Sequence, residues 1–172
     1  MGPVERLLTE DHARLEALLA RAAADPDRID SEAYARFRAG LLRHIGMEEK
    51  ILLPTAQRLR GGDPLPAAAK LRLDHGALAA LLVPTPTPAI VAAIRAILAG
   101  HNIIEEGPGG VYETCERLVG AEVQSLFAKL RAAPAVPVAK HCDGPKIIEA
   151  TRRALARAGY DLGEYERTAS RP

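Results

Sequence analysis

The sequence has few aromatic residues, only two cysteines and almost no net charge, and each scarcity excludes a class of protein. Aromatic side chains make up 3% of the residues, while Ala and Leu dominate the apolar 48%, a composition typical of helices rather than sheets. Cys115 and Cys142 make no disulfide framework, so a reducing, cytoplasmic setting is expected. A net charge of +1 gives no reason to expect attraction to nucleic acid or to a membrane surface.

Long uninterrupted apolar runs are also missing. Residues 76–94 carry no formal charge, but Pro84, Pro86 and Pro88 break the run, which is typical of a loop between two helices rather than a membrane span. The N-terminal residues MGPVERLLTED carry charges where a signal peptide needs an apolar core, so no secretory targeting is expected. We expect a soluble protein with one domain and one additional element.

The stretch HIGMEEKILLP, residues 44–54, places an imidazole and a carboxylate four residues apart, on one face of a helix. His44 and Glu48 fall on an apolar stripe with Phe37, Leu41 and Leu52, which predicts that both are buried. An unpaired buried charge costs several kcal/mol, so Glu48 needs a counter-ion. A metal ion bound by both side chains supplies it; for this segment alone, a surface His–Glu pair on a slightly rotated helix is the alternative.

The same pattern recurs along the chain. The motif DHARLEALL returns as DHGALAALL, and HIGMEE returns as HNIIEE. Each motif puts a histidine on the apolar stripe of a predicted helix, and the second also places a glutamate one turn later. One such histidine is usually a packed core residue, but four on four helices indicate a metal site. The repeats give six candidate metal ligands: His12, His44, Glu48, His75, His101 and Glu105.

These repeats predict an all-α fold, an up-down-up-down four-helix bundle in which each helical hairpin contributes three ligands. The bundle is expected over residues 1–132, and residues 133–172 are expected to form a linker and a short C-terminal helix. Capping residues, prolines and glycines place the helices at about residues 3–24, 31–60, 64–82, 88–106, 111–132 and 146–158.

Six ligands exceed the four of a typical zinc site and suit two metal ions bridged by Glu48 and Glu105. Each ion then has two imidazoles and one oxygen from each carboxylate, and a bridging hydroxide or oxide adds a fifth donor. This histidine-rich set carries less negative charge than a four-glutamate di-iron site, which favours ligand binding over high-valent oxidation. His141, beside Cys142 in the linker, is interpreted as structural or incidental.

Taken in order, His12, HIGMEEKILLP, DHGALAALL and HNIIEE resemble the hemerythrin-like, HHE cation-binding family over about residues 4–130. The resemblance implies two non-haem iron ions and small ligands such as dioxygen, nitric oxide or peroxide. Carried over residue by residue, it implies the same metal ligands: His12, His44, Glu48, His75, His101 and Glu105.

One departure from the family pattern concerns a missing ligand. The oxygen-carrying hemerythrins have a second histidine one turn after that of the third helix, and Ala79 stands at this place. The centre is therefore expected to be one imidazole short and more open, which argues against simple reversible oxygen carriage. Glu16, one turn after His12, either fills the gap or pairs with an arginine on the helix surface.

A second departure is the sequence GPGG at residues 107–110, which interrupts the fourth helix where the family's helix usually continues. The interruption raises the question of which neighbouring glutamate reaches the metal. Glu105 lies about 40° from His101 around the helix, whereas Glu106 lies about 140° away. Glu105 is therefore expected to be the ligand.

Three classes of function fit these observations. The leading hypothesis is a di-iron module that binds, senses or scavenges dioxygen, nitric oxide or peroxide. The second is an enzyme that reduces peroxide or nitric oxide, or donates iron for the repair of iron–sulfur clusters. The third is a regulatory adaptor with a structural metal, such as zinc, whose C-terminal helix docks a protein partner. Neither nucleic acid nor a membrane is expected as a partner.

Overall fold

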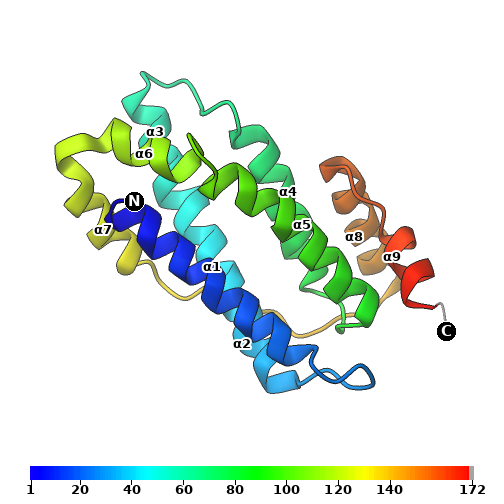
Figure 1. Ribbon diagram of the computed structural model, residues 1–172. Helices are drawn as coiled ribbons and strands as arrows, with labels where there is room; N and C mark the ends of the chain where they lie inside the picture. Colours follow the sequence, from blue (N-terminus) through cyan, green and yellow to red (C-terminus); the bar gives the residue numbers. More distant parts are fainter. Residues whose placement is uncertain (171–172) are drawn as a thin grey trace.

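The computed structural model describes residues 1–170, and this part of the chain is helical without any strand (Figure 1). The elements in chain order are α1 (Pro3–Ala22), α2 (Ser31–Met47), η1 (Glu48–Leu52), α3 (Leu53–Leu59), α4 (Ala68–Leu81), α5 (Pro88–Glu106), α6 (Val111–Val119), η2 (Gly120–Glu122), α7 (Val123–Arg131), α8 (Pro145–Ala158) and α9 (Leu162–Ala169). The all-α prediction is confirmed.

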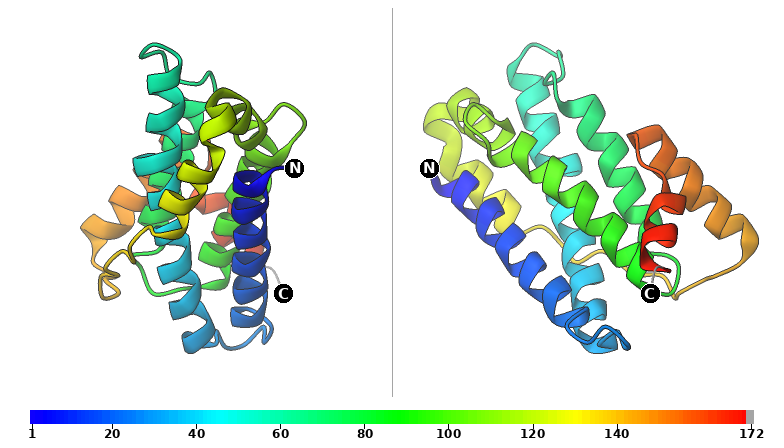
Figure 2. Two further views of the ribbon diagram at one scale, coloured as in Figure 1. Left: turned by 90° about the vertical axis from the view of Figure 1, so that its left-hand side faces the viewer. Right: turned by 45° about the vertical axis from the view of Figure 1, so that its right-hand side comes forward.

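Four long helical segments form the predicted bundle. Helix α1 and the continuous segment α2–η1–α3 make one antiparallel hairpin, and α4 and α5 make the second (Figures 1 and 2). The chain therefore runs up, down, up and down, as the sequence predicts. Helices α6 and α7 fold back across the end of the bundle that holds the N-terminus, where they lie against α1 and α3.

Local sequence explains where the helices begin and end. Asp30 caps α2, because its carboxylate accepts a hydrogen bond from a first-turn N–H at 3.0 Å. Helix α4 begins at Ala68, later than predicted, because Pro66 disfavours helical backbone at the residue before it. Gly120, at φ +53°, divides the predicted single helix over residues 111–132 into α6 and α7.

The second long segment is not a uniform α-helix. Element η1 is a π-helical turn over Glu48–Leu52, between α2 and α3. Such a turn widens the helix locally and is frequent at functional sites. Here it begins at Glu48, one of the candidate metal ligands, so the side chains after Glu48 leave the helix in directions that a regular α-helix would not give. The sequence pattern does not predict this turn.

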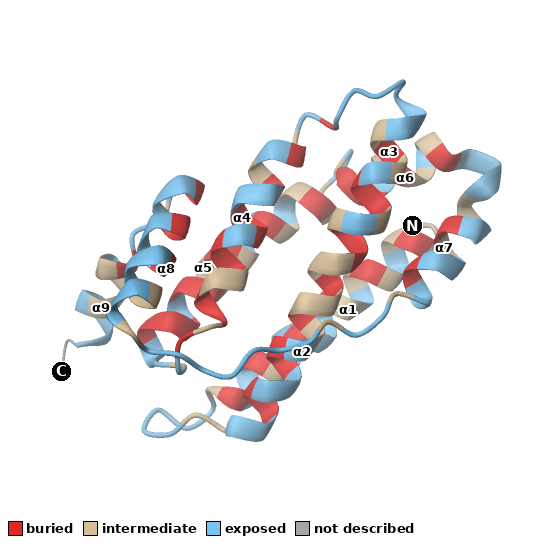
Figure 3. Cartoon of the chain, turned by 180° about the vertical axis from the view of Figure 1, so that it is seen from behind, coloured by how far each residue is buried: buried red, intermediate tan, exposed pale blue. Residues whose placement is uncertain are grey.

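The interior of the bundle consists of two apolar clusters with a polar layer between them. The first cluster contains Leu15, Leu41 and Ile97, and the second contains Leu8, Met47 and Leu71. Buried positions follow the inward faces of the long helices (Figure 3). Each long helix contributes to both clusters and carries its histidine between them: Leu8, His12 and Leu15 in α1; Leu41, His44 and Met47 in α2; Leu71, His75 and Leu78 in α4; Ile97, His101 and Ile104 in α5. The amphipathic stripes predicted from the sequence therefore face inward, with the histidines at one level.

Helix α5 begins the stretch Pro88–Arg131, which is long and apolar enough, by length and composition alone, to cross a membrane, with a mean hydropathy of 1.3 in its best window. Core helices of soluble proteins share this property. Helix α5 buries Ile90, Ile94 and Ile97 in the first apolar cluster. Packing between helices therefore accounts for its composition.

The linker after α7 is tied to the side of the bundle over residues 132–144. Arg38 of α2 donates a hydrogen bond to the carbonyl oxygen of Ala139 at 2.8 Å. His141 Nδ1 lies 3.2 Å from the carbonyl oxygen of Val83, in the loop between α4 and α5. His141 thus connects the linker to the loop between α4 and α5.

Two C-terminal helices follow the linker. Helix α8 packs on α4 and α9 packs on α5, and Leu155 and Leu162 lie buried in the first apolar cluster. The sequence predicts α8 but not the short α9. Arg152 pairs with Glu166 at 2.8 Å, so part of the basic face of α8 is neutralised within the extension. The division of the chain near residue 132 stays a prediction, although the extension shares a core with the bundle.

Because Leu155 is fully buried between α8 and the bundle, Leu155→Ala should lower the free energy of unfolding by about 2–5 kcal/mol. The matched control is Val138→Ala in the linker, an exposed position where the change should stay within about 0.5 kcal/mol. Chemical denaturation followed by circular dichroism measures both. An unchanged transition in Leu155→Ala would show that the extension folds separately from the bundle.

Candidate metal centre

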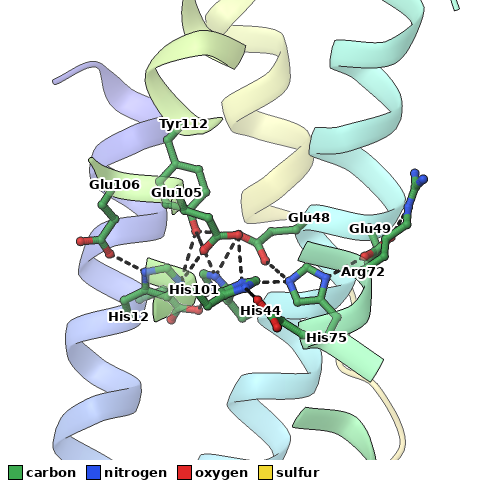
Figure 4. Close-up of polar contacts among 12 residues, drawn as sticks. His12, His44, Glu48, Glu49, Arg72, His75, His101, Glu105, Glu106 and Tyr112 are labelled. Carbon is green, nitrogen blue, oxygen red and sulfur yellow. Dashed lines mark hydrogen bonds and ion pairs between the residues drawn. The ribbon is translucent and has the colours of Figure 1, made fainter. Parts of the chain in front are cut away.

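The polar layer between the two apolar clusters contains all six candidate ligands. His12 comes from α1, His44 from α2 and Glu48 from η1, while α4 supplies His75 and α5 supplies His101 and Glu105 (Figure 4). All six side chains point toward one another, and each residue is between 1% and 6% exposed. The structure therefore brings together every residue that the sequence places in the site.

The six side chains form two overlapping groups of four, and both groups contain Glu48 and Glu105. In the first group, His44 Nε2 lies 3.3 Å from Glu48 Oε1, and His12 Nε2 lies 3.5 Å from Glu105 Oε2. In the second group, His75 Nε2 lies 3.1 Å from Glu48 Oε2, and His101 Nε2 lies 3.1 Å from Glu105 Oε1. Each carboxylate thus offers one oxygen to each group, which is the arrangement of a bridging ligand.

A carboxylate outside the centre faces the Nδ1 atom of every imidazole. The four carboxylate–imidazole pairs are Asp11 with His44 at 2.9 Å, Glu49 with His75 at 2.6 Å, Asp74 with His101 at 3.4 Å, and Glu106 with His12. Each aspartate serves a histidine of its own hairpin, whereas each glutamate serves a histidine of the other hairpin. These contacts hold a proton on Nδ1 and leave the Nε2 lone pairs directed into the centre.

The inward-facing atoms of the centre are matched to a cation rather than to one another. When Nδ1 carries the proton, a neutral imidazole presents an acceptor at Nε2, and His75 Nε2 lies only 3.1 Å from His101 Nε2. Glu48 Oε2 and Glu105 Oε1 are also acceptors, and both are buried without a hydrogen bond. Buried acceptors that face one another are costly unless positive charge lies between them. A bound metal cation would satisfy this requirement.

The charges of the centre also shift the pKa values of its groups. Burial lowers the pKa of His44, but the Glu48 carboxylate and the other acidic partners outweigh burial and raise it to about 10. Burial also lowers the pKa of His101, but contacts with Asp74 and Glu105 outweigh burial and raise this pKa to about 9. Burial and then the charge of Glu48 raise the pKa of Glu105. All three shifts favour added positive charge, which a metal ion supplies more strongly than protons do.

Tyr112 is a further member of the centre that the sequence motifs do not identify. Its hydroxyl donates a hydrogen bond to Glu48 Oε1 at 2.5 Å and lies 3.0 Å from Glu105 Oε2. Burial, followed by these two carboxylates, raises its pKa well above the ordinary value. A signal was present in the sequence, since Tyr112 lies on the apolar stripe of α6 with Cys115 and Val119, just after the GPGG turn.

The structure also places the residues that the sequence left as alternatives. Glu105 points into the centre, as the angular argument predicts, and Glu106 contacts His12 from outside. Glu16 is exposed and belongs to neither group of donors, while Ala79 carries no ligand atom and is half-buried. Glu16 therefore does not replace the imidazole that is missing at Ala79.

If the outer carboxylates orient the imidazoles, then Glu49→Ala and Glu106→Ala should each weaken metal binding by about 10–100-fold. Glu16→Ala is the matched control, because it removes a glutamate that is exposed and outside both groups. Competition with a chelator measures the affinities, and circular dichroism checks that all variants fold. Equal affinities in the three variants would show that the outer contacts do not act on the centre.

Comparison with known proteins agrees with this geometry. Residues 4–83 match a family model, the hemerythrin HHE cation binding domain, and the matched stretch includes His12, His44, Glu48 and His75. No curated protein matches the chain, and no solved structure matches it. The matched stretch and the two buried His/Glu groups fit a metal-binding protein, and over residues 4–83 the chain is similar to the hemerythrin HHE cation-binding domain.

Proposed function

We propose that this protein holds a non-haem di-iron centre and uses it to bind, sense or scavenge a small ligand such as dioxygen, nitric oxide or peroxide. The observation that carries the proposal is the pair of four-donor groups that share Glu48 and Glu105. His12 and His44 would hold one iron and His75 and His101 the other, with both carboxylates between them. Two ions in these groups supply Lewis-acidic, redox-active positions where a small molecule exchanges with water.

The donor set supports iron over a purely structural ion. A structural zinc site is closed by four ligands in a tetrahedron, and a single such site needs neither six donors nor shared carboxylates. Mixed imidazole and carboxylate donors suit iron, and a six-coordinate ion in either group keeps places that the four donors do not fill. The proposal therefore assigns these places to an exchangeable ligand.

The rest of the chain prepares the site for this role. The outer carboxylates hold the imidazoles in one orientation, so little rearrangement is needed when an ion binds. The apolar clusters above and below the polar layer exclude bulk water and strengthen the electrostatic interactions within it. The Tyr112 hydroxyl lies 2.5 Å from Glu48 Oε1 and fixes the direction of that carboxylate.

A cavity lies beside the centre, at His12. It has a volume of about 400 Å³, lies between α1 and α5, and has His12 in its wall. Leu15, Leu19 and Leu98 line it, while Glu16 and Arg95 contribute its charged groups. A mainly apolar cavity next to His12 suits uncharged diatomic molecules better than hydrated ions, which supports the ligand class proposed here.

Iron reconstitution under anaerobic conditions should give about two iron ions per chain. His44→Ala and His101→Ala each remove an imidazole from one group and should lower the affinity by at least about 100-fold. His141→Ala is the control, because His141 ties the linker to Val83 and lies outside both groups. Metal analysis after gel filtration measures the content. One iron per chain, or equal retention by the three variants, would contradict the di-iron proposal.

Addition of nitric oxide to the reduced, iron-loaded protein tests the ligand-binding role. We expect a change in visible absorption that saturates with added nitric oxide, because exchangeable places remain on the ions. The zinc-loaded protein is the control and should show no such change. A loaded iron protein whose spectrum is indifferent to nitric oxide, dioxygen and peroxide would leave the metal with a structural role and would contradict the proposal.

A further inference from the structure

The two groups of donors differ in one feature, the hydroxyl oxygen of Tyr112. Tyr112 Oη lies 3.2 Å from His12 Nε2, 3.4 Å from His44 Nε2, 2.5 Å from Glu48 Oε1 and 3.0 Å from Glu105 Oε2. These four atoms are the donors of the first group. Figure 4 shows the ring of Tyr112 directed at this end of the centre from above.

The distances have the values expected for neighbouring ligands of one metal ion. Metal–ligand bonds of about 2.1 Å set adjacent ligands of an octahedron about 3.0 Å apart. Tyr112 Oη lies between 2.5 and 3.4 Å from all four donors, a range around the spacing that a fifth ligand of the same ion would have. A hydroxyl that served only Glu48 would not need to be close to both imidazoles.

The second group has no equivalent oxygen. Among residues 1–170, the polar contacts of His75 Nε2 and His101 Nε2 are with each other and with the two shared carboxylates. The cause is the different course of the chain after the two glutamates. After Glu48 the helix continues through η1 into α3, whereas after Glu106 it stops and turns back into α6, which carries Tyr112.

The turn that delivers Tyr112 depends on its glycines. Gly109 has φ +71°, a backbone conformation that other residues rarely adopt. A Cβ atom at Gly107 would lie 2.5 Å from the carbonyl oxygen of Ile103, and one at Gly110 would lie 2.5 Å from that of Glu105. The GPGG sequence, which had no role in the predicted metal site, therefore positions a side chain of the centre.

We propose that Tyr112 is a metal ligand, so that the ion held by His12 and His44 has five protein donors and the ion held by His75 and His101 has four. The inference rests on the proposed di-iron centre and adds a ligand to it. Ligation breaks the O–H bond of Tyr112, forms a bond between Oη and the metal ion, and releases one proton to solvent. No oxidation state changes, so no oxidant or reductant is required.

Visible spectroscopy of the oxidised, iron-loaded protein tests this assignment, because a phenolate bound to iron(III) gives a charge-transfer band. The unmodified protein should show the band, and Tyr112→Phe should lose it while retaining the same iron content. Tyr34→Phe is the matched control, since Tyr34 is equally buried, has no hydrogen bond at its hydroxyl and lies in the apolar cluster away from the centre. This control variant should keep the band.

A two-iron protein without the band, or a band that survives Tyr112→Phe, would overturn the proposal and leave Tyr112 as a hydrogen-bond donor to Glu48. If Tyr112→Phe does not fold, resonance Raman spectra of the unmodified protein decide the question by the presence or absence of phenolate ring vibrations.

Failure to take up iron would instead contradict the proposed function. Ultraviolet difference spectra on zinc addition then show whether a tyrosine loses its proton to the metal, and no difference would overturn the ligand assignment.

Discussion

The constraint on which this structure depends is the convergence of four imidazole nitrogens and two carboxylates in the middle of a helical bundle. All six residues are buried, and when the imidazoles are neutral with their protons on Nδ1, the atoms that face inward are all acceptors. Such a layer would destabilise an ordinary core by several kcal/mol. Positive charge at the centre would turn the same layer into the feature that joins the two hairpins, because both groups of donors share the carboxylates of Glu48 and Glu105.

The fold is built around this layer in a nearly two-fold manner. Each hairpin gives two histidines and one of the two shared glutamates. The outer glutamates contact histidines of the opposite hairpin, since Glu49 reaches His75 and Glu106 reaches His12. The apolar clusters on either side exclude water, and α8 and α9 cover the outer faces of α4 and α5. The symmetry is broken where one helix continues through a π turn and the other ends in a glycine turn.

The sequence predicts the bundle and the six inward side chains because helical periodicity fixes which residues share a face, and the duplicated motifs repeat that face. It does not predict features that depend on how the chain turns. Tyr112 reaches the centre only because the GPGG turn reverses the chain, and η1 alters the helix locally at Glu48. The sequence hints at two of the outer carboxylates, since Asp11 and Asp74 directly precede histidines in the repeated motifs. It does not predict their partners, His44 and His101, which lie on other helices.

Anomalous diffraction from crystals of the iron-loaded protein is the measurement that tests the two-ion account most directly. The account predicts two iron peaks between the carboxylates of Glu48 and Glu105, about 3.5–4 Å apart, one beside His12 and His44 and the other beside His75 and His101. A single peak, or iron bound elsewhere while the six side chains keep their positions, would contradict it.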